Sequence, residues 1–271
     1  MSSTSSELIT RIEAGKAAVL AQTALLHREF GRAQSLWKAD GTRVTPVDIA
    51  ISENITATLR ARFPDDEFFS EELSGPGADA PIPLRARFAW VFDPIDGTNN
   101  YAKGFAHCAI SAALLENGRP VYGIIYDMSR RVLMHGGPGF GVFDGERAVA
   151  VSQKEPTEYS LVGYHSPYDK RFVEHGRIVV ANYKIRGLGS STLHLAYVAN
   201  GMLEGVFDDN VKIWDIAAAI PMCLAGGGEF CFRNGANPLP LRVFDLNMPR
   251  IQYYAGGAAF CARMRSLLEK F

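Results

Sequence analysis

The stretch VFDPIDGTNN, from Val91 to Asn100, places two aspartates three residues apart, behind an apolar run and ahead of a Gly-Thr pair. The alternating aromatic residues before Asp93 predict a strand at about 87–92 that runs into this aspartate. Asp93 and Asp96 would then both lie at the carboxyl end of the strand, where α/β sheets place their ligands. The segment therefore makes these two carboxylates candidates for a ligand-binding site.

The residues around the two aspartates suit a metal and a phosphate. Pro94 limits the backbone, and apolar Ile95 can contribute only a carbonyl oxygen, so the segment forms a hard-oxygen cluster suited to Mg²⁺. Gly97 and Thr98 are expected to open a helix or tight turn whose free N–H groups hold a phosphate, while the Thr98 hydroxyl orients a water. An Asp-Pro-x-Asp-Gly run is also a good surface turn, so the segment alone leaves both interpretations open.

The whole chain limits the alternatives. Its 271 residues suit one large domain or two packed halves, and 47% apolar residues are enough for a core. A net charge of -1 gives no support to a nucleic-acid or anionic-membrane partner. We expect a soft boundary near 145–155 that divides the chain into an N-terminal α+β half, 1–148, and a C-terminal α/β half, 149–271.

The sequence shows neither a targeting signal nor a cysteine pattern typical of a metal site or disulfide framework. The N-terminus lacks a basic cluster followed by an apolar core, and no stretch reaches the roughly 18 apolar residues of a membrane span, which predicts a cytoplasmic protein. The cysteines lie far apart without CxxC spacing. This spacing predicts reduced, mostly buried thiols and neither a zinc site nor a disulfide framework, at Cys108, Cys223, Cys231 and Cys261.

Hydrophobic periodicity predicts an alternation of helices and strands. A helix is expected from Ser6 to about Phe30, and a second after Thr45, which can cap it, with Pro46 in its first turn. Asn117-Gly118 is a strong hairpin signal. Strands are expected at 109–115, 121–126, 132–134, 159–163, 178–181 and 205–207. Further helices are expected at 191–200, 215–225 and 258–268.

Five segments make the sequence recognisable. They are VTPVD (Val44 to Asp48), SEE (Ser70 to Glu72), DPIDGT (Asp93 to Thr98), RGLGSS (Arg186 to Ser191) and WDIAAA (Trp214 to Ala219). In this order and spacing, over roughly residues 5–262, the chain resembles the inositol monophosphatase family of lithium-sensitive, magnesium-dependent phosphomonoesterases. The resemblance implies an α/β (α+β) fold, the five-layer αβαβα sandwich of the sugar phosphatases, with an active site between the two halves and a homodimeric assembly.

The resemblance also implies residue roles. The metal ligands would be Glu71, Asp93, the carbonyl of Ile95, Asp96 and Asp215, holding two or three Mg²⁺ ions with Mn²⁺ as a substitute. The catalytic set would be Thr98, Asp48 and Glu71, with Thr98 orienting the attacking water and Asp48 accepting the hydroxyl hydrogen. The substrate contacts would be Asp96, Gly97, Thr98, Gly189, Ser190, Ser191 and Asp208. The half 1–148 would thus carry most metal ligands, and the half 149–271 the substrate-contact segment and the last metal ligand.

Each acid also has an ordinary structural explanation. Asp48 suits the first turn of a helix, Asp215 suits a helix N-cap, and Glu71 with Glu72 suits a solvated charge pair. Only the family resemblance explains these acids together with DPIDGT. The six histidines lack the spacing of metal ligands. The sequence has no Gly-rich loop ending in Lys-Ser/Thr, so it gives no sign of nucleotide hydrolysis of the P-loop type.

The substrate is less well defined than the chemistry. Asn99 after Thr98 is similar to inositol phosphatases, whereas KADGTRVT is similar to histidinol phosphatases, Asp208 stands where inositol enzymes carry Glu, and Lys212 offers a second anion contact. We expect an inositol monophosphate or a similar polyol or sugar phosphate. Histidinol phosphate, fructose 1,6-bisphosphate and 3'-phosphoadenosine 5'-phosphate remain alternatives, as does a non-enzymatic partner-binding regulator of transcription or ribosome biogenesis.

Overall fold

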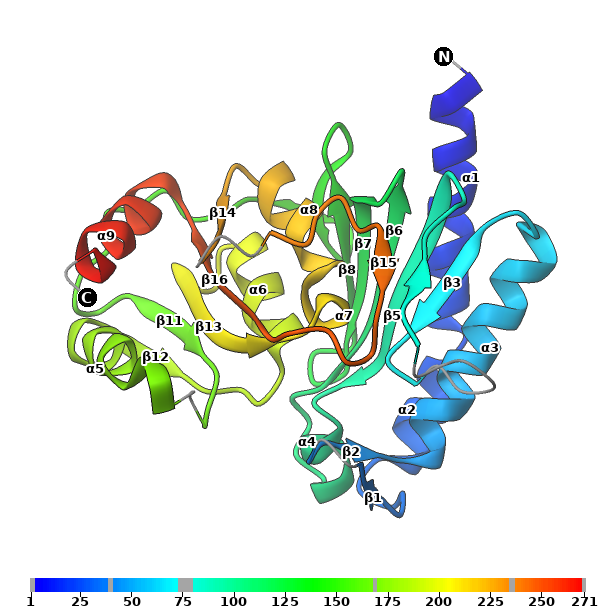
Figure 1. The fold of residues 1–271 in the computed structure, drawn as a ribbon, viewed down its shortest axis with the longest axis horizontal. Coiled ribbons are helices and arrows are strands. Elements are labelled where there is room, and N and C mark those ends of the chain that lie inside the picture. Colours follow the sequence, from blue (N-terminus) through cyan, green and yellow to red (C-terminus); the bar gives the residue numbers. More distant parts are fainter. Residues whose placement is uncertain (1–2, 39–40, 73–79, 168–169, 234–236, 270–271) are drawn as a thin grey trace.

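Two mixed β-sheets alternate with three layers of helices, which confirms the expected five-layer αβαβα fold (Figure 1). The computed structural model describes residues 3–38, 41–72, 80–167, 170–233 and 237–269. One outer layer comprises α1 (Ser3–Leu20), α2 (Thr23–Glu29) and α3 (Pro46–Arg62). The central layer comprises α6 (Ser191–Ala199), α7 (Ile213–Ile216) and α8 (Ala219–Ala225), and the other outer layer comprises α5 (Val173–Asn182) and α9 (Ala258–Leu268).

The larger sheet has the strand order β10-β9-β8-β7-β6-β5-β3. Its strands are β3 (Glu67–Ser70), β5 (Phe88–Asp96), β6 (Ala109–Glu116), β7 (Arg119–Asp127), β8 (Val132–Gly137), β9 (Gly141–Asp144) and β10 (Arg147–Val149). The β6–β7 turn contains Asn117 at φ 50° and Gly118 at φ 77°. Positive φ at both positions matches the right-handed twist of paired strands, as the hairpin prediction requires.

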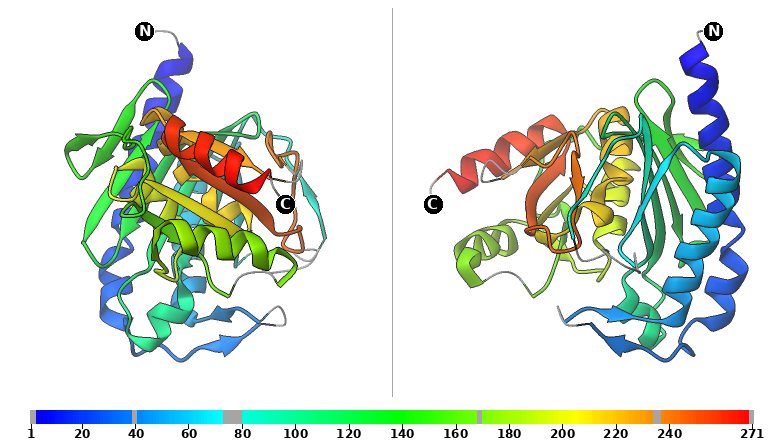
Figure 2. Two further views of the ribbon diagram at one scale, coloured as in Figure 1. Left: turned by 90° about the vertical axis from the view of Figure 1, so that its left-hand side faces the viewer. Right: turned by 45° about the vertical axis from the view of Figure 1, so that its right-hand side comes forward.

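The smaller sheet has the order β12-β11-β13-β16-β14 (Figure 2). Its strands are β11 (Leu161–Tyr164), β12 (Lys184–Arg186), β13 (Gly205–Val211), β14 (Glu229–Phe232) and β16 (Ile251–Gly256). Two short antiparallel pairs complete the described strands: β1 (Leu36–Trp37) with β2 (Arg43–Val44), and β4 (Ile82–Pro83) with β15 (Val243–Phe244). A short helix α4 (Thr98–Lys103) and a 3-10 turn η1 (Lys170–Phe172) lie in connections.

Apolar side chains fill the space between the layers in three clusters. One lies between the α1–α3 layer and the large sheet, the largest surrounds α6, α7 and α8 between the two sheets, and the third joins the small sheet to α5 and α9. Because each sheet is covered on both faces, its strands carry apolar residues on both sides. Among the described residues, no helix is both long and apolar enough to cross a membrane.

Several expected elements differ from the structure. The predicted strand at 178–181 is wrong, because these residues lie in α5; Val179 is buried and Val180 is 57% exposed, as in a helix with one covered face. A short apolar run does not distinguish the two states. The helix expected at 6–30 is divided at Ala21 and Gln22, and that expected at 215–225 is divided between α7 and α8. Strands β3, β14 and β16 were not predicted.

Helix α1 packs tightly on the large sheet at Gly15. A Cβ atom at this position would lie 2.6 Å from Cη2 of Trp90 and 2.8 Å from Cδ1 of Ile124. The Trp90 ring has little freedom to move, since it is fully buried and its Nε1 donates a hydrogen bond to Asp66. Glycine therefore serves close packing here at the expense of helix propensity.

We expect Gly15→Ala to destabilise the protein by about 1–3 kcal/mol, because overpacking against Trp90 outweighs the gain of about 1 kcal/mol in helix propensity. Urea unfolding of the two proteins measures the difference. An unchanged or higher midpoint for the variant would show that α1 shifts away from the sheet at little cost.

Candidate active site

A β-bulge in β5 brings Asp93 and Asp96 to the same face of the large sheet. Asp93 pairs with Ser111 of β6 and Asp96 pairs with Ala109, so three steps along β5 match two along β6. In a regular strand, residues three apart point to opposite faces, and one extra residue reverses that alternation. Ile95 consequently packs in the outer cluster, on the side of α1 to α3, and both carboxylates face α6 and α7.

Strand β3 delivers Glu71 to the same place. It runs parallel to β5 with Ser70 opposite Phe92, and the Glu71 amide donates to the Phe92 carbonyl at 3.2 Å. The residue after Ser70 therefore lies beside the residue after Phe92, which is Asp93. Strand pairing thus joins two motifs that are more than twenty positions apart in the sequence.

Asp215 reaches the site from the first turn of α7. It is the third residue of this helix and not its N-cap, and its Oδ2 accepts a 2.7 Å hydrogen bond from the Lys212 amide. The Thr192 hydroxyl donates to the Asp215 carbonyl at 2.7 Å, which fixes α7 against α6. Carboxylate oxygens of Glu71, Asp93 and Asp215 all lie within 4.8 Å of one another.

The start of α6 holds Asp96. Its Oδ2 accepts 2.6 Å hydrogen bonds from the Ser190 hydroxyl and the Thr192 amide. Ser190 is also the N-cap of α6, because its hydroxyl oxygen accepts from the Leu193 amide. One serine therefore begins the helix and orients a carboxylate of the opposing sheet.

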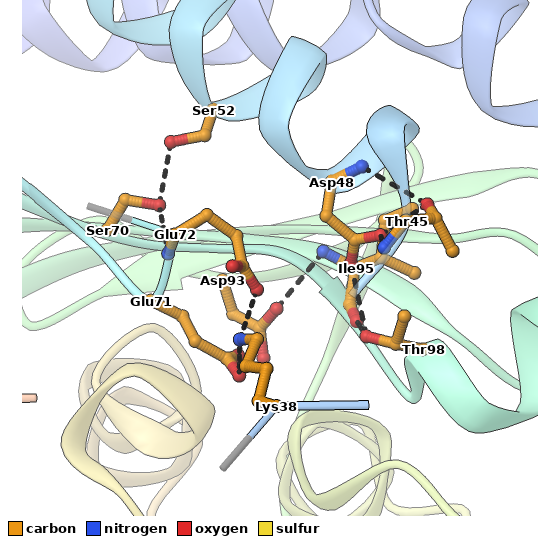
Figure 3. A network of polar contacts seen from close by, with 10 residues as sticks. All are labelled: Lys38, Thr45, Asp48, Ser52, Ser70, Glu71, Glu72, Asp93, Ile95 and Thr98. Atoms are coloured by element: carbon orange, nitrogen blue, oxygen red, sulfur yellow. Dashed lines mark hydrogen bonds and ion pairs between the residues drawn. The ribbon is translucent and has the colours of Figure 1, made fainter. Parts of the chain in front are cut away.

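Thr98 and Asp48 form the hydrogen-bonded pair that the resemblance implies (Figure 3). The Thr98 hydroxyl lies 3.1 Å from Asp48 Oδ1 and 2.9 Å from the Ile95 carbonyl. Asp48 is the acidic partner in the capping box of α3, where its Oδ2 accepts from the amide and hydroxyl of Thr45. The structural and functional explanations of Asp48 are therefore compatible.

Lys38, which follows β1, supplies a positive charge beside the acids (Figure 3). Its ammonium donates to Glu71 at 2.9 Å and to Glu72 at 2.5 Å. Ser70, the departure from the usual family glycine, is not at positive φ, and its hydroxyl accepts from the Ser52 hydroxyl and the Glu72 amide. The serine thus fits without strain, and Glu71 and Glu72 are a charge-paired, partly buried couple.

Burial and mutual repulsion raise the pKa values of the acids. Burial, followed by the charges of the neighbouring acids, raises the pKa of Asp93 and of Asp215 well above the usual range. Burial also raises the pKa of Asp48 and of Asp96 to about 6, and that of Glu72 to about 7. Close, buried, hard-oxygen donors that repel one another fit a divalent cation such as Mg²⁺.

A cavity of about 520 Å³ opens beside these groups. Its walls include many of the expected residues: Glu71, Asp93, Ile95, Asp96, Gly97, Thr98, Gly189, Ser191 and Asp215. Ser190 and Asp208 are fully or almost fully buried and lie outside the lining. Asp208 acts on the wall through a neighbour, because its Oδ2 accepts a 3.0 Å hydrogen bond from the Ser191 hydroxyl.

Other wall residues were not foreseen. They include Trp37, Arg43, His165, Asn210, Trp214 and Arg250. Trp214 lies in α7 and belongs to the WDIAAA motif, although no role was predicted for it. The others come from short strands and loops without a recognised motif, except that Trp37 and Arg43 flank the KADGT segment. The suggested anion contact of Lys212 is not supported, because its ammonium donates to the Met248 carbonyl and it does not line the cavity.

Comparisons with known proteins agree with the fold and the motifs. The model of the "Inositol monophosphatase family" matches residues 5–259, so the chain belongs to the inositol monophosphatase family. An inositol-1-monophosphatase of Mesorhizobium japonicum is 32% identical over 75% of this chain and 78% of its own length. The Nus factor SuhB of Xylella fastidiosa is 31% identical over 82% of this chain and 81% of its own.

Solved structures show the same architecture. The crystal structure of the extragenic suppressor protein suhB from Bartonella henselae has a TM-score of 0.83 at 26% identity, over 96% of this chain and 99% of the other. A Thermotoga maritima IMPase has a TM-score of 0.82 at 22% identity, over 96% and 97%, which at this identity concerns the fold alone.

The raised pKa values make the effect of Mg²⁺ on stability depend on pH. From about pH 4 to about pH 7 the metal-free folded state binds more protons than the unfolded chain, so its free energy of unfolding should fall as the pH rises. Mg²⁺ bound to the ionised acids would oppose this loss.

We therefore expect the difference in Tm between samples with Mg²⁺ and with EDTA to be larger at about pH 7.5 than at about pH 5. Thermal unfolding at the two pH values measures it. An equal difference at both pH values would contradict a site made of these carboxylates.

Proposed function

We propose that this protein hydrolyses a small phosphate monoester in a Mg²⁺-dependent reaction, with a polyol or sugar phosphate such as inositol monophosphate as substrate. The observation that carries the proposal is the convergence of Glu71, Asp93 and Asp215 within 4.8 Å beside a cavity that Thr98 also lines. Family membership supports the same chemistry. A cytoplasmic location and a homodimer remain predictions.

The metal would be held by oxygen donors from three elements. Glu71, Asp93 and Asp215 form the central group, and the Ile95 carbonyl and Asp96 add donors at its edge. When bound, two or three Mg²⁺ ions lower the pKa of a water and neutralise charge on the phosphate and leaving oxygens; Mn²⁺ would serve as a substitute. Ser190 and Thr192 would keep Asp96 oriented toward this group.

Thr98 and Asp48 would orient the attacking water, with Glu71 as the third member of the catalytic set. A hydroxyl group has one hydrogen, so when Thr98 donates it to Asp48 or to the Ile95 carbonyl, its lone pairs are left to accept from a water. The raised pKa of Asp48 means that a neighbouring cation or a pH near neutrality is needed to keep it an acceptor.

The remaining wall would bind the substrate. Gly97 and Thr98 would direct backbone N–H groups to the phosphate, and Gly97 has φ 88°, which favours glycine. Gly189 and Ser191 would contact the alcohol part directly. We propose that Ser190 and Asp208 act through their neighbours, Asp96 and Ser191 respectively.

A second candidate is a partner-binding regulatory role. It is favoured by the relative from Xylella fastidiosa that carries the name Nus factor SuhB. Phosphate release distinguishes the two candidates. An enzyme must hydrolyse a phosphate ester with its acids, whereas a purely regulatory protein need not hydrolyse any.

The first test is phosphate release with Mg²⁺ or EDTA from inositol 1-phosphate, histidinol phosphate, fructose 1,6-bisphosphate and 3'-phosphoadenosine 5'-phosphate. We expect Mg²⁺-dependent turnover with a preference for inositol 1-phosphate, and inhibition by millimolar Li⁺. A different preferred ester would correct the substrate. No turnover of any ester by folded protein would favour the regulatory role.

Asp93→Asn should reduce turnover by several orders of magnitude, because Asp93 is at the centre of the acidic cluster. The same change removes a repelling buried charge, so the metal-free variant should unfold at the same or a higher temperature near neutral pH. The matched control is Asp65→Asn, at an exposed position, which should leave both properties unchanged. Near-normal turnover by Asp93→Asn would contradict the metal assignment.

A further inference from the structure

Three of the four cysteines converge at the β14 edge of the small sheet, although Cys261 follows the other two by thirty residues or more in the sequence. Cys231 lies on β14, Cys223 on α8 and Cys261 in the first turn of α9. The sulphur atoms of Cys223 and Cys261 are both 3.8 Å from the Glu229 carbonyl oxygen. The thiols are free, as the sequence predicted, but its spacing gave no sign that they are neighbours.

Cys231 and Cys261 form the inner pair of this group. Their sulphur atoms and a carboxylate oxygen of Glu229 all lie within 4.8 Å of one another. Cys261 is fully buried, whereas Cys231 is partly exposed and Glu229 is exposed. A small reagent in solution can therefore reach Cys231 first, with Cys261 directly behind it.

The surroundings of Cys231 favour its thiolate. Hydrogen bonds from Cys261, and then from Tyr254 and Arg265, lower the pKa of Cys231 to about 6 against the opposing effects of burial and of Glu229. The fold supplies these donors, because Tyr254 pairs with Cys231 across β14 and β16, and Arg265 lies one helical turn after Cys261. The same contact raises the pKa of Cys261, which stays a thiol.

We propose that Cys231 is a hydroperoxide-reactive thiol and Cys261 its resolving partner, so that oxidation joins α9 to β14 by a reversible disulfide. In the first step the Cys231 thiolate attacks hydrogen peroxide; an S–O bond forms, the O–O bond breaks, and hydroxide leaves and takes a proton to become water. In the second step the Cys261 sulphur attacks Cys231; the S–S bond forms and the S–O bond breaks. The departing hydroxide takes up the proton that Cys261 loses and leaves as a second water. Two electrons pass from the thiols to the peroxide.

Glu229 and Arg265 have separate parts in this sequence. The Glu229 carboxylate, within 4.8 Å of both sulphur atoms, accepts the proton that Cys261 loses when it attacks. Arg265 stabilises the Cys231 thiolate and lies 4.0 Å from Glu229 Oε2. A guanidinium already placed among these ligand atoms opposes a zinc ion, since the two positive charges would repel each other, and so the thiol pair is the better assignment.

The test is peroxide treatment of the purified protein, followed by thiol alkylation in denaturant and peptide mass spectrometry. We expect a Cys231–Cys261 disulfide that dithiothreitol removes. Buried Cys108 and Cys223 should stay reduced during peroxide treatment and should therefore be alkylated in denaturant. Cys261→Ser should instead leave a sulfenic acid at Cys231 that dimedone traps. Circular dichroism and Tm of each variant establish that it is folded.

A second measurement tests the role of Arg265. Arg265→Gln should slow iodoacetamide alkylation of Cys231 in the native protein by roughly twofold at about pH 6, because this exposed guanidinium is the weakest of the three donors that lower the pKa of Cys231. Arg263→Gln removes the same charge from an exposed position of the same helix and should not change the rate. Three results would overturn the proposal: alkylation unaffected by Arg265→Gln, no Cys231–Cys261 link after peroxide, or stoichiometric zinc that Cys231→Ser removes.

Discussion

The β-bulge between Asp93 and Asp96 turns both carboxylates toward the helices between the sheets, and the other groups of the site are placed in relation to that pair. Without the extra residue, Asp96 would face the apolar cluster under α1 to α3, where Ile95 now packs, and an unpaired carboxylate there would be costly. The bulge also suits Pro94, which cannot donate a hydrogen bond to a regular ladder. This single bulge thus decides which residues at the end of β5 face the site and which face the apolar cluster under α1 to α3.

The acidic site lowers the stability that burial of apolar side chains provides. Apolar burial on both faces of the large sheet stabilises the protein, while the acids at the end of β5 are buried close together and raise one another's pKa values. Rigid neighbours make this arrangement sustainable: α6 holds Asp96, β3 holds Glu71 and the first turn of α7 holds Asp215. A divalent cation would convert that repulsion into a binding free energy that an isolated carboxylate cannot provide.

Helices and strands with strong local signals were predictable, and those that depend on distant contacts were not. Thr45 and Pro46 define the start of α3, and Asn117-Gly118 defines a turn, because each acts within a few residues. The apolar run at 178–181 has no such signal, and packing of Val179 against the small sheet decides that it is helical. Likewise, β3 and β16 are ordered by their partner strands.

The sequence by itself determined the chemistry available to the site, since DPIDGT, SEE and WDIAAA contain the acids and the threonine, and five motifs in order indicate one family. Tertiary structure decided which groups meet. It placed Lys38 on Glu71 and Glu72, added Trp37 and Arg43 to the cavity wall, and moved Ser190 and Asp208 behind it. It also brought the sulphur atoms of Cys231 and Cys261 within 4.8 Å of each other. The physical reason is that side-chain type and local backbone preference are encoded residue by residue, whereas proximity, burial and pKa arise only when distant segments pack together.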